Sequence, residues 1–400
     1  MEPVQLAAVL AALVVVASIV SVELGISVAL IELGLGVFAG NLFNLDPHAD
    51  WLVFIASFAS IVLTFLAGAE VDPDDFRERF GASLSIGLVS FAGPFVVAWL
   101  VSYELLGWTL KASLIAGTAL STTSLAVVYA VLVESGLNAT RVGKLLMSAC
   151  FVTDMGTALA LSAIFIKPNA WFPVFLVVSI ALIVALPKIS PWFFRRYGDR
   201  VIEPEIKLVF VCLFLLMVVA DKAKGHAVLP AFILGLMMAR HYQEHQKEQE
   251  RLRVVAFAFL TPFFFLRGGM NVSLGAVFAN LGVLGVLVAA KMAPKLGLVF
   301  PLARRHVPEH ATFITLLMST GLTFGTISSL YGLNAHIINR TQFSLLVTVV
   351  VLSAIVPTAV AQRRFSPDPD KERRHHAVPD PSEVFTGPRV PVLPGGRERR

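Results

Sequence analysis

Hydrophobic positions fill almost the whole chain in stretches of about 20 residues, the length at which a helix crosses the ~30 Å hydrocarbon core of a bilayer. Short clusters of charged residues separate these stretches as far as Gln362. Transmembrane barrel strands would instead give short segments of alternating polarity, which the sequence lacks. The pattern predicts an all-α polytopic membrane protein.

The boundaries between apolar runs and charge clusters predict thirteen transmembrane helices. The first run lacks the positively charged start and the cleavage site of a secretory signal, so we expect it to be retained. The second and ninth runs are short and contain Gly or Pro, which leaves twelve spans as the alternative. The predicted ranges are 4–21, 25–43, 51–70, 82–103, 108–132, 141–166, 170–187, 205–221, 225–241, 254–272, 279–302, 309–331 and 339–362.

Lys and Arg give the orientation independently, because they concentrate on the cytoplasmic connections of membrane proteins. One set of helix ends carries Lys111, Lys167, Lys222, Lys224 and Arg340. The opposite set carries Arg77, Arg79, Arg141, Lys144, Lys188, Arg195, Arg196, Arg200, Lys207, Arg240, Lys247, Arg251, Arg253, Arg304, Arg305, Arg363 and Arg364. Seventeen against five predicts an outside N-terminus, a cytoplasmic C-terminus and a multi-pass protein of the cell (inner) membrane.

Composition agrees with a membrane protein, since 56% of the residues are hydrophobic and 15% are charged, against about 25% charged in a soluble domain. Cys150 and Cys212, the two cysteines, lie inside apolar runs, which argues against a disulfide framework or a thiolate metal site. The sequence has no GxSxG or HExxH motif, so an intramembrane enzyme is not expected. We expect no cofactor and no nucleic-acid partner. Residues 363–400 are rich in Pro and charge and are predicted to form a disordered cytoplasmic tail.

Two apolar runs are interrupted by small hydroxylated residues. The fifth contains Ser121, Thr122 and Thr123, and the twelfth contains Ser319, Thr320, Gly321 and Thr323. Such residues weaken a helix, and their hydroxyls can satisfy the carbonyls that a break releases. Close helix packing through Ser and Thr is the alternative reading.

The positions of these interruptions predict internal symmetry. If helices one to six and eight to thirteen are two repeats and the seventh is a linker, the fifth and the twelfth are equivalent and run in opposite directions. The sequence thus predicts two inverted-topology repeats whose broken helices cross near the midplane and surround a transported ion.

Asp154 is the one charged residue in the apolar segment SACFVTDMGTALALS. A carboxylate at the bilayer centre costs roughly 2.5 to 3.5 kcal/mol on insertion scales and is therefore expected to be functional. It can hold a proton or a monovalent cation, Na⁺ or K⁺, and a structural salt bridge is the alternative. Thr153 offers either a hydroxyl ligand or a packing contact, and Ser121, Thr122 and Thr123 are further candidate ligands.

The order of several segments resembles the monovalent cation:proton antiporter family of the Kef and NapA type. The segments are LTFLAGAEVDPDDFRERF, GTALSTTSLAVVYAVLVESG, the helix that carries Asp154, FFFLRGGM and KMAPKLGLVFPLARR. The resemblance implies a cation/proton exchanger with an elevator mechanism, with Na⁺ favoured over K⁺. It also implies that residues 1–362 form a membrane domain and that two copies of the chain form a homodimer. Core helices would lie at about 82–166 and 279–362, dimerisation helices at about 4–70 and 205–272, and a linker helix at about 170–187.

The resemblance also implies roles for single residues. Asp154 matches the aspartate that binds cation and proton, and the hydroxyl run matches the broken helix beside it. A core lysine should face this site. Lys291 and Lys295 lie four apart, hence on one helical face, and the run PKLG favours Lys295, while one of the two is expected to extend to the interface. Arg267 is expected near the outer interface.

The chain departs from the family pattern at two points. Electrogenic members carry two adjacent aspartates, whereas this chain has Thr153 before Asp154, which favours electroneutral exchange. Kef-type channels usually continue into a soluble nucleotide-binding domain, whereas a short tail is expected here. A Kef-like gated potassium efflux channel remains the alternative function.

Overall fold

The computed structural model describes residues 2–24, 27–43, 45–71, 80–137, 140–165, 169–198, 200, 202–223, 225 and 227–368. The described residues form helices and no strands, which confirms the all-α prediction. Arg77, Arg79, Lys167, Lys224 and the predicted tail from residue 369 onward lie outside the described residues.

Helices occupy every range that the apolar pattern predicts. Their bounds are α1 Pro3–Leu24, α2 Val28–Leu42, α3 Asp50–Ala69, α5 Phe80–Leu100, α6 Leu110–Ser121, α7 Leu125–Glu134, α8 Arg141–Phe165, α9 Phe172–Tyr197, α10 Pro204–Lys222, α11 Val228–Glu244, α12 Gln246–Val255, α13 Thr261–Met270, α14 Leu274–Ala279, α15 Leu281–Pro294, α16 Phe300–His306, α17 Ala311–Met318, α18 Thr323–Asn334 and α19 Arg340–Val360. Short π-helical turns extend α5 and α19 and join α12 to α13 and α15 to α16.

Nine helical stretches among the described residues are long and apolar enough to cross a membrane. Two shorter apolar helices, Val28–Leu42 and Leu110–Ser121, are part of the same bundle. The chain is therefore a multi-pass membrane protein by length and composition, while thirteen spans and the inverted repeats stay predictions.

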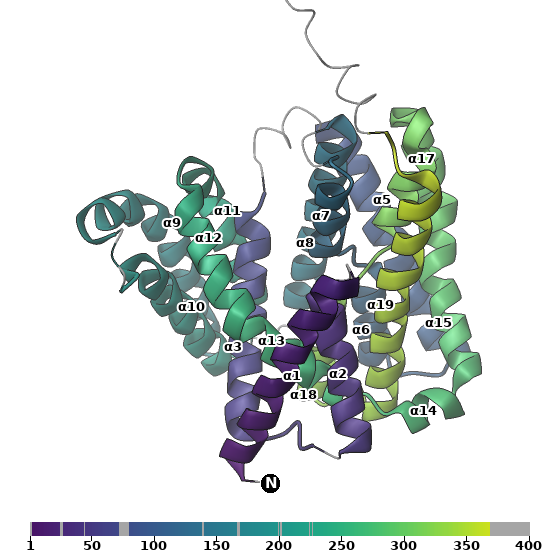
Figure 1. The fold of residues 1–400 in the computed structure, drawn as a ribbon, viewed down its shortest axis with the longest axis horizontal. Coiled ribbons are helices and arrows are strands. Elements are labelled where there is room, and N and C mark those ends of the chain that lie inside the picture. The colour runs from purple at the N-terminus through teal and green to yellow at the C-terminus, as the bar shows by residue number, and fades with distance from the viewer. Residues whose placement is uncertain are drawn as a thin grey trace, which may run out of the picture.

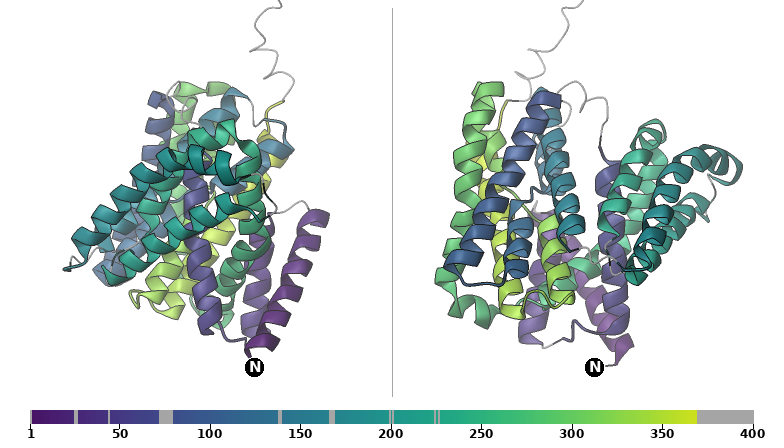
Figure 2. Two further views of the ribbon diagram at one scale, coloured as in Figure 1. Left: turned by 90° about the vertical axis from the view of Figure 1, so that its left-hand side faces the viewer. Right: turned by 180° about the vertical axis from the view of Figure 1, so that it is seen from behind.

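The helices pack in two groups, which stand side by side in Figure 1 and exchange sides in the reversed view of Figure 2. In the first, α2 packs along α13, α3 along α11, and α9 against α10 and α11. In the second, α5 packs against α6, α8 and α15, while α18 packs against α6 and α19. We call these the flanking group and the broken-helix group. They meet where α8 contacts α3 and α11.

Glycines bring the helices of the flanking group close together. A Cβ on Gly68 of α3 would collide with the backbone of Phe232, and one on Gly235 of α11 would collide with the backbone of Phe65. Such small residues let helix backbones approach where lipid supplies no hydrophobic drive for association. This close contact joins α3 to α11 as one unit beside the broken-helix group.

Candidate ion site

Both predicted interruptions are breaks in the helices. Helix α6 ends at Ser121, Thr122 adopts an extended conformation with φ −66° and ψ 153°, and α7 begins at Leu125. Helix α17 ends at Met318, and α18 begins at Thr323 after Leu322, which has φ −143° and ψ −71°. The breaks leave the last carbonyls of α6 and α17 without partners inside their own helices.

Lys295 joins the two breaks. Its Nζ donates to the carbonyl oxygens of Met318 at 2.6 Å and Thr122 at 3.1 Å, one from each broken helix. It also donates to the hydroxyls of Thr123 at 2.9 Å and Ser90 at 3.1 Å. A buried ammonium is costly unless it is hydrogen-bonded, and these four oxygens supply the compensation. The predicted preference for Lys295 as the residue at the breaks agrees with this geometry.

Lys291 lies one turn earlier on the same helix and is also fully buried. Its Nζ donates to the Thr122 carbonyl oxygen at a longer distance, 3.4 Å. A Cβ at Gly321 would collide with this amine, so glycine at the second break makes room for it. The expectation that one of the two lysines extends to the interface is wrong for this conformation, because neither side chain is exposed.

Asp154 lies on α8 and is 2% exposed. Its Oδ1 has no hydrogen-bond partner, and within the described part of the chain no ion pair joins it to Lys295. The carboxylate faces a cavity of about 350 Å³ that is also lined by Glu70, Leu125, Tyr129, Arg253 and Thr323. A buried carboxylate without a fixed partner, beside a cavity, is a site where a proton or a cation can bind.

The other predicted ligands are Thr153 on α8 and the hydroxylated residues of the first break. Their hydroxyls donate to carbonyl oxygens one turn earlier: Thr153 to Cys150 at 2.7 Å, Ser121 to Thr118 at 2.9 Å and Thr122 to Ala119 at 3.1 Å. Each hydroxyl oxygen keeps lone pairs that can accept. All of these residues are buried, and none of them lines the cavity beside Asp154.

The second break contributes differently. Ser319 and Thr320 donate to the carbonyls of Thr315 and Leu317, at 2.7 and 2.8 Å. Thr323, at the start of α18, lines the cavity together with Asp154. Among the predicted residues, the structure therefore places Thr323 with the carboxylate, and it places Lys295 and Thr123 at the crossing of the breaks.

Sequence reasoning missed the pair Glu70 and Arg253. Arg253 donates to Glu70 Oε1 from Nε at 3.0 Å and from Nη2 at 2.9 Å. Glu70 directly follows the apolar run of α3, and Arg253 directly precedes the predicted apolar run at 254–272. Each looked like an ordinary charge at a helix end.

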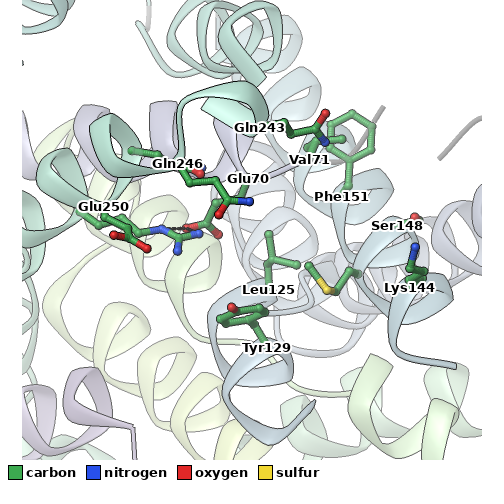
Figure 3. A pocket seen from close by; sticks show the side chains of 13 residues that line it. Glu70, Val71, Leu125, Tyr129, Lys144, Ser148, Phe151, Gln243, Gln246 and Glu250 are labelled. Atoms are coloured by element: carbon green, nitrogen blue, oxygen red, sulfur yellow. Dashed lines mark hydrogen bonds and ion pairs between the residues drawn. The ribbon is translucent and has the colours of Figure 1, made fainter. Parts of the chain in front are cut away.

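A second, more polar cavity of about 340 Å³ adjoins the first at Glu70 and Arg253. Figure 3 shows Glu70 and Gln246 on one side of this cavity and Lys144 and Ser148 on the other. Several of its residues belong to segments that carry the excess of Lys and Arg, so it lies toward the predicted cytoplasmic face.

Aromatic packing joins α8, α11 and α18 near Asp154. Phe232 of α11 stacks on Phe151 of α8, with ring centroids 5.6 Å apart, and meets Phe324 of α18 at 6.2 Å. A smaller cavity of about 140 Å³ is lined by residues such as Ser60, Tyr331 and Asn334.

Arg267 lies inside the protein and is 2% exposed, while its place near the outer membrane interface stays a prediction. It donates to the carbonyl oxygen of Pro47 at 3.0 Å and to Asn334 Oδ1 at 3.1 Å. Helices α2 and α3 enclose α13 and bury the end of the helix that carries Arg267. The hydrogen bond from Arg267 to Asn334 links α13 of the flanking group to α18 on the side away from Glu70.

The transmembrane sodium/hydrogen exchanger family model matches residues 8–362. The chain is 28% identical over 273 residues to "Probable Na(+)/H(+) antiporter 3" of Methanocaldococcus jannaschii, covering 65% of this chain and 69% of that protein. It is 26% identical over 272 residues to the Na(+)/H(+) antiporter NhaS5 of Synechocystis, covering 66% and 38%. It is 24% identical over 368 residues to the K(+)/H(+) antiporter 1 of Saccharomyces cerevisiae, covering 83% and 41%. The chain thus spans less than half the length of the last two relatives.

The fold is similar to that of the sodium proton antiporter MjNhaP1 from Methanocaldococcus jannaschii at pH 8. The TM-score is 0.70 at 14% sequence identity, and the match covers 91% of this chain and 99% of that chain. This likeness concerns the fold alone. Since the family match extends over almost all of the helical region, the chain belongs to the sodium/hydrogen exchanger family.

Proposed function

We propose that this protein exchanges one monovalent cation for one proton across the cell membrane, with Asp154 as the binding carboxylate. The observation that carries the proposal is Asp154 itself, which is buried, has an oxygen without a hydrogen-bond partner and faces a cavity. Proton and cation compete for this carboxylate. Either ligand neutralises it, and the neutral site can cross the apolar layer at low cost, whereas the empty charged site cannot.

The transported cation is Na⁺ in this proposal, with K⁺ as the second candidate. Both prefer hard oxygen ligands, and the cavity offers the carboxylate of Asp154 and the hydroxyl of Thr323. The names of relatives support exchange of a monovalent cation, because they include both Na(+)/H(+) and K(+)/H(+) antiporters.

The broken-helix group is the moving part of the proposed elevator. Lys295 holds both helix breaks together through Thr122 and Met318, so the breaks and the carboxylate can move as one body. The flanking group, with its close glycine contacts, is the proposed static part and the proposed dimer interface. In this scheme the thirteen helices form two inverted repeats, with the N-terminus outside and the C-terminus in the cytoplasm.

The cycle is electroneutral if Lys295 keeps its proton, because Asp154 then carries one proton or one cation. Thr153 cannot titrate and so cannot add a second proton. Four acceptor oxygens around the Lys295 amine favour the protonated lysine throughout the cycle.

Purified protein in proteoliposomes tests the proposal. An imposed pH gradient should collapse on addition of Na⁺ or K⁺, at a rate that does not change with a valinomycin-set potential. Cation current without proton movement would instead identify a channel of the Kef-like kind. A steep voltage response that disappears in Lys295→Gln would show that the lysine carries a second proton.

A further inference from the structure

The two cavities on the predicted cytoplasmic side share four lining residues: Glu70, Leu125, Tyr129 and Arg253. A cation that passes from the polar cavity to Asp154 has to pass these side chains. Figure 3 shows Glu70 between the helix that carries Gln246 and Glu250 and the helix that carries Leu125 and Tyr129. Glu70 is therefore the carboxylate at the passage between the cavities.

Glu70 is fixed to α3 and α12, and α12 contacts α10 and α11 of the flanking group. Both donor nitrogens that reach its Oε1 belong to Arg253 of α12. Gln249, one turn earlier on α12, donates to the carbonyl oxygen of Ala69 at 3.2 Å and holds the end of α3 in place. The Glu70 side chain is 20% exposed and that of Arg253 is 33% exposed, so the pair lies at the edge of water.

Asp154, Leu125 and Tyr129 belong to the broken-helix group, on α8 and α7. In this conformation Glu70 and Asp154 line one cavity, and the charge of Glu70 acts on Asp154. Arg253 lines the same cavity and partly balances that charge. Of the two, Glu70 is the charge that acts most on Asp154, so the pair has a net negative influence at the ion site.

We propose that Glu70 is a positioning residue that strengthens cation binding at Asp154 on one side of the membrane only. The inference rests on the proposed exchange function and deepens it. When the broken-helix group moves, Asp154 leaves the vicinity of Glu70, because Glu70 stays with α3 and α12. The site then binds its cation more tightly from the Glu70 side than from the opposite side.

The charges predict opposite effects of two substitutions. Glu70→Gln leaves the positive Arg253 near the passage and weakens cation binding, whereas Arg253→Gln leaves Glu70 unbalanced and strengthens it. We expect each single substitution to change the half-maximal cation concentration by roughly three- to tenfold, as a partly screened charge near the ion site would. The double variant removes both charges and should bind the cation more weakly than the parent protein but more tightly than Glu70→Gln. A purely structural ion pair would give losses in the same direction for both single variants.

The test measures the half-maximal cation concentration separately at each face, in everted and in right-side-out membrane vesicles. An alkaline pH is needed, because at acidic pH proton and cation gain equally from Glu70 and the competition hides the effect. We expect the half-maximal concentration to rise in Glu70→Gln and to fall in Arg253→Gln, at one face and not at the other. Glu70→Asp should retain most of the parent asymmetry.

Shifts in the same direction for both single variants, or equal shifts at both faces, would overturn the role of Glu70 while leaving exchange intact. Absence of exchange in the parent protein would instead contradict the proposed function. Glu250→Gln is the matched control, because this carboxylate lines the polar cavity and not the cavity of Asp154. It should change the half-maximal concentration less than Glu70→Gln does.

Discussion

The amine of Lys295 lies 2.6 Å from the carbonyl oxygen of Met318 and 3.1 Å from that of Thr122. These are carbonyls at the C-terminal ends of two half-helices, where the backbone dipoles place partial negative charge. One ammonium group thus satisfies both ends. Within a bilayer no water can replace the Lys295 amine as a donor, so the stability of both helix breaks depends on this contact.

We therefore expect Lys295→Met to destabilise the protein by about 3–5 kcal/mol, the cost of leaving a buried polar network without one partner. Lys291→Met should cost less, because Lys291 makes one hydrogen bond, at 3.4 Å. Thermal unfolding in detergent, followed by size-exclusion chromatography, compares the two. Equal losses of thermal stability would show that the network around Lys295 is not the one that holds the breaks.

The sequence predicted the two helix breaks and the buried carboxylate, but it did not predict which side chains of different helices contact each other. Hydroxyl runs and Gly321 predicted where α6 and α17 break, since such residues weaken a helix wherever they occur. The run of apolar residues around Asp154 predicted a functional carboxylate. Glu70 and Arg253 were not found, because each lies at the end of an apolar run, where a charge is common. Their pairing depends on how α3 and α12 pack, and periodicity along the chain carries no information about that.

Replacing Asp154 by Asn keeps the shape of the side chain and removes its ability to titrate. We expect cation-driven proton movement to fall to the level of protein-free liposomes, because no other carboxylate is fully buried at this cavity. Thermal stability should stay the same or rise, since a buried charge without a partner is costly. Exchange near the parent rate in a well-folded Asn variant would place the ion site elsewhere.

Substitutions at Thr323 and Thr123 distinguish a residue that binds the cation from a residue that stabilises the helix breaks. Thr323→Val removes a hydroxyl from the cavity and should raise the half-maximal cation concentration severalfold with little change in stability. Thr123→Val removes the bond from Lys295 and the bond to Met318, and should lower stability by about 1–3 kcal/mol. Cation titrations of exchange and thermal unfolding distinguish the two effects. The assignment fails if Thr323→Val leaves the titration unchanged.

The hydrogen bond from Arg267 to Asn334 joins α13 to α18 at 3.1 Å on the side away from Glu70. If it helps to close that side, Asn334→Ala should raise the fraction of molecules that are open there. A cysteine at Ser60, which lines the small cavity on this side, reports the change. We expect a membrane-impermeant maleimide to label Ser60→Cys severalfold faster in the Asn334→Ala background. An unchanged labelling rate would show that the hydrogen bond from Arg267 to Asn334 does not help to close that side.

The effect of Glu70 should depend on pH, because the proton and the cation compete for Asp154. The titratable and charged groups around Glu70 are Arg253 and Glu250 of α12, Lys144 and Asp154 of α8, and Tyr129 of α7. At alkaline pH few protons occupy Asp154, so the half-maximal cation concentration should differ between the parent protein and Glu70→Gln. At acidic pH the charge of Glu70 favours the proton and the cation equally, so the difference should disappear. A difference of the same size at acidic and alkaline pH would contradict an electrostatic action of Glu70 on Asp154.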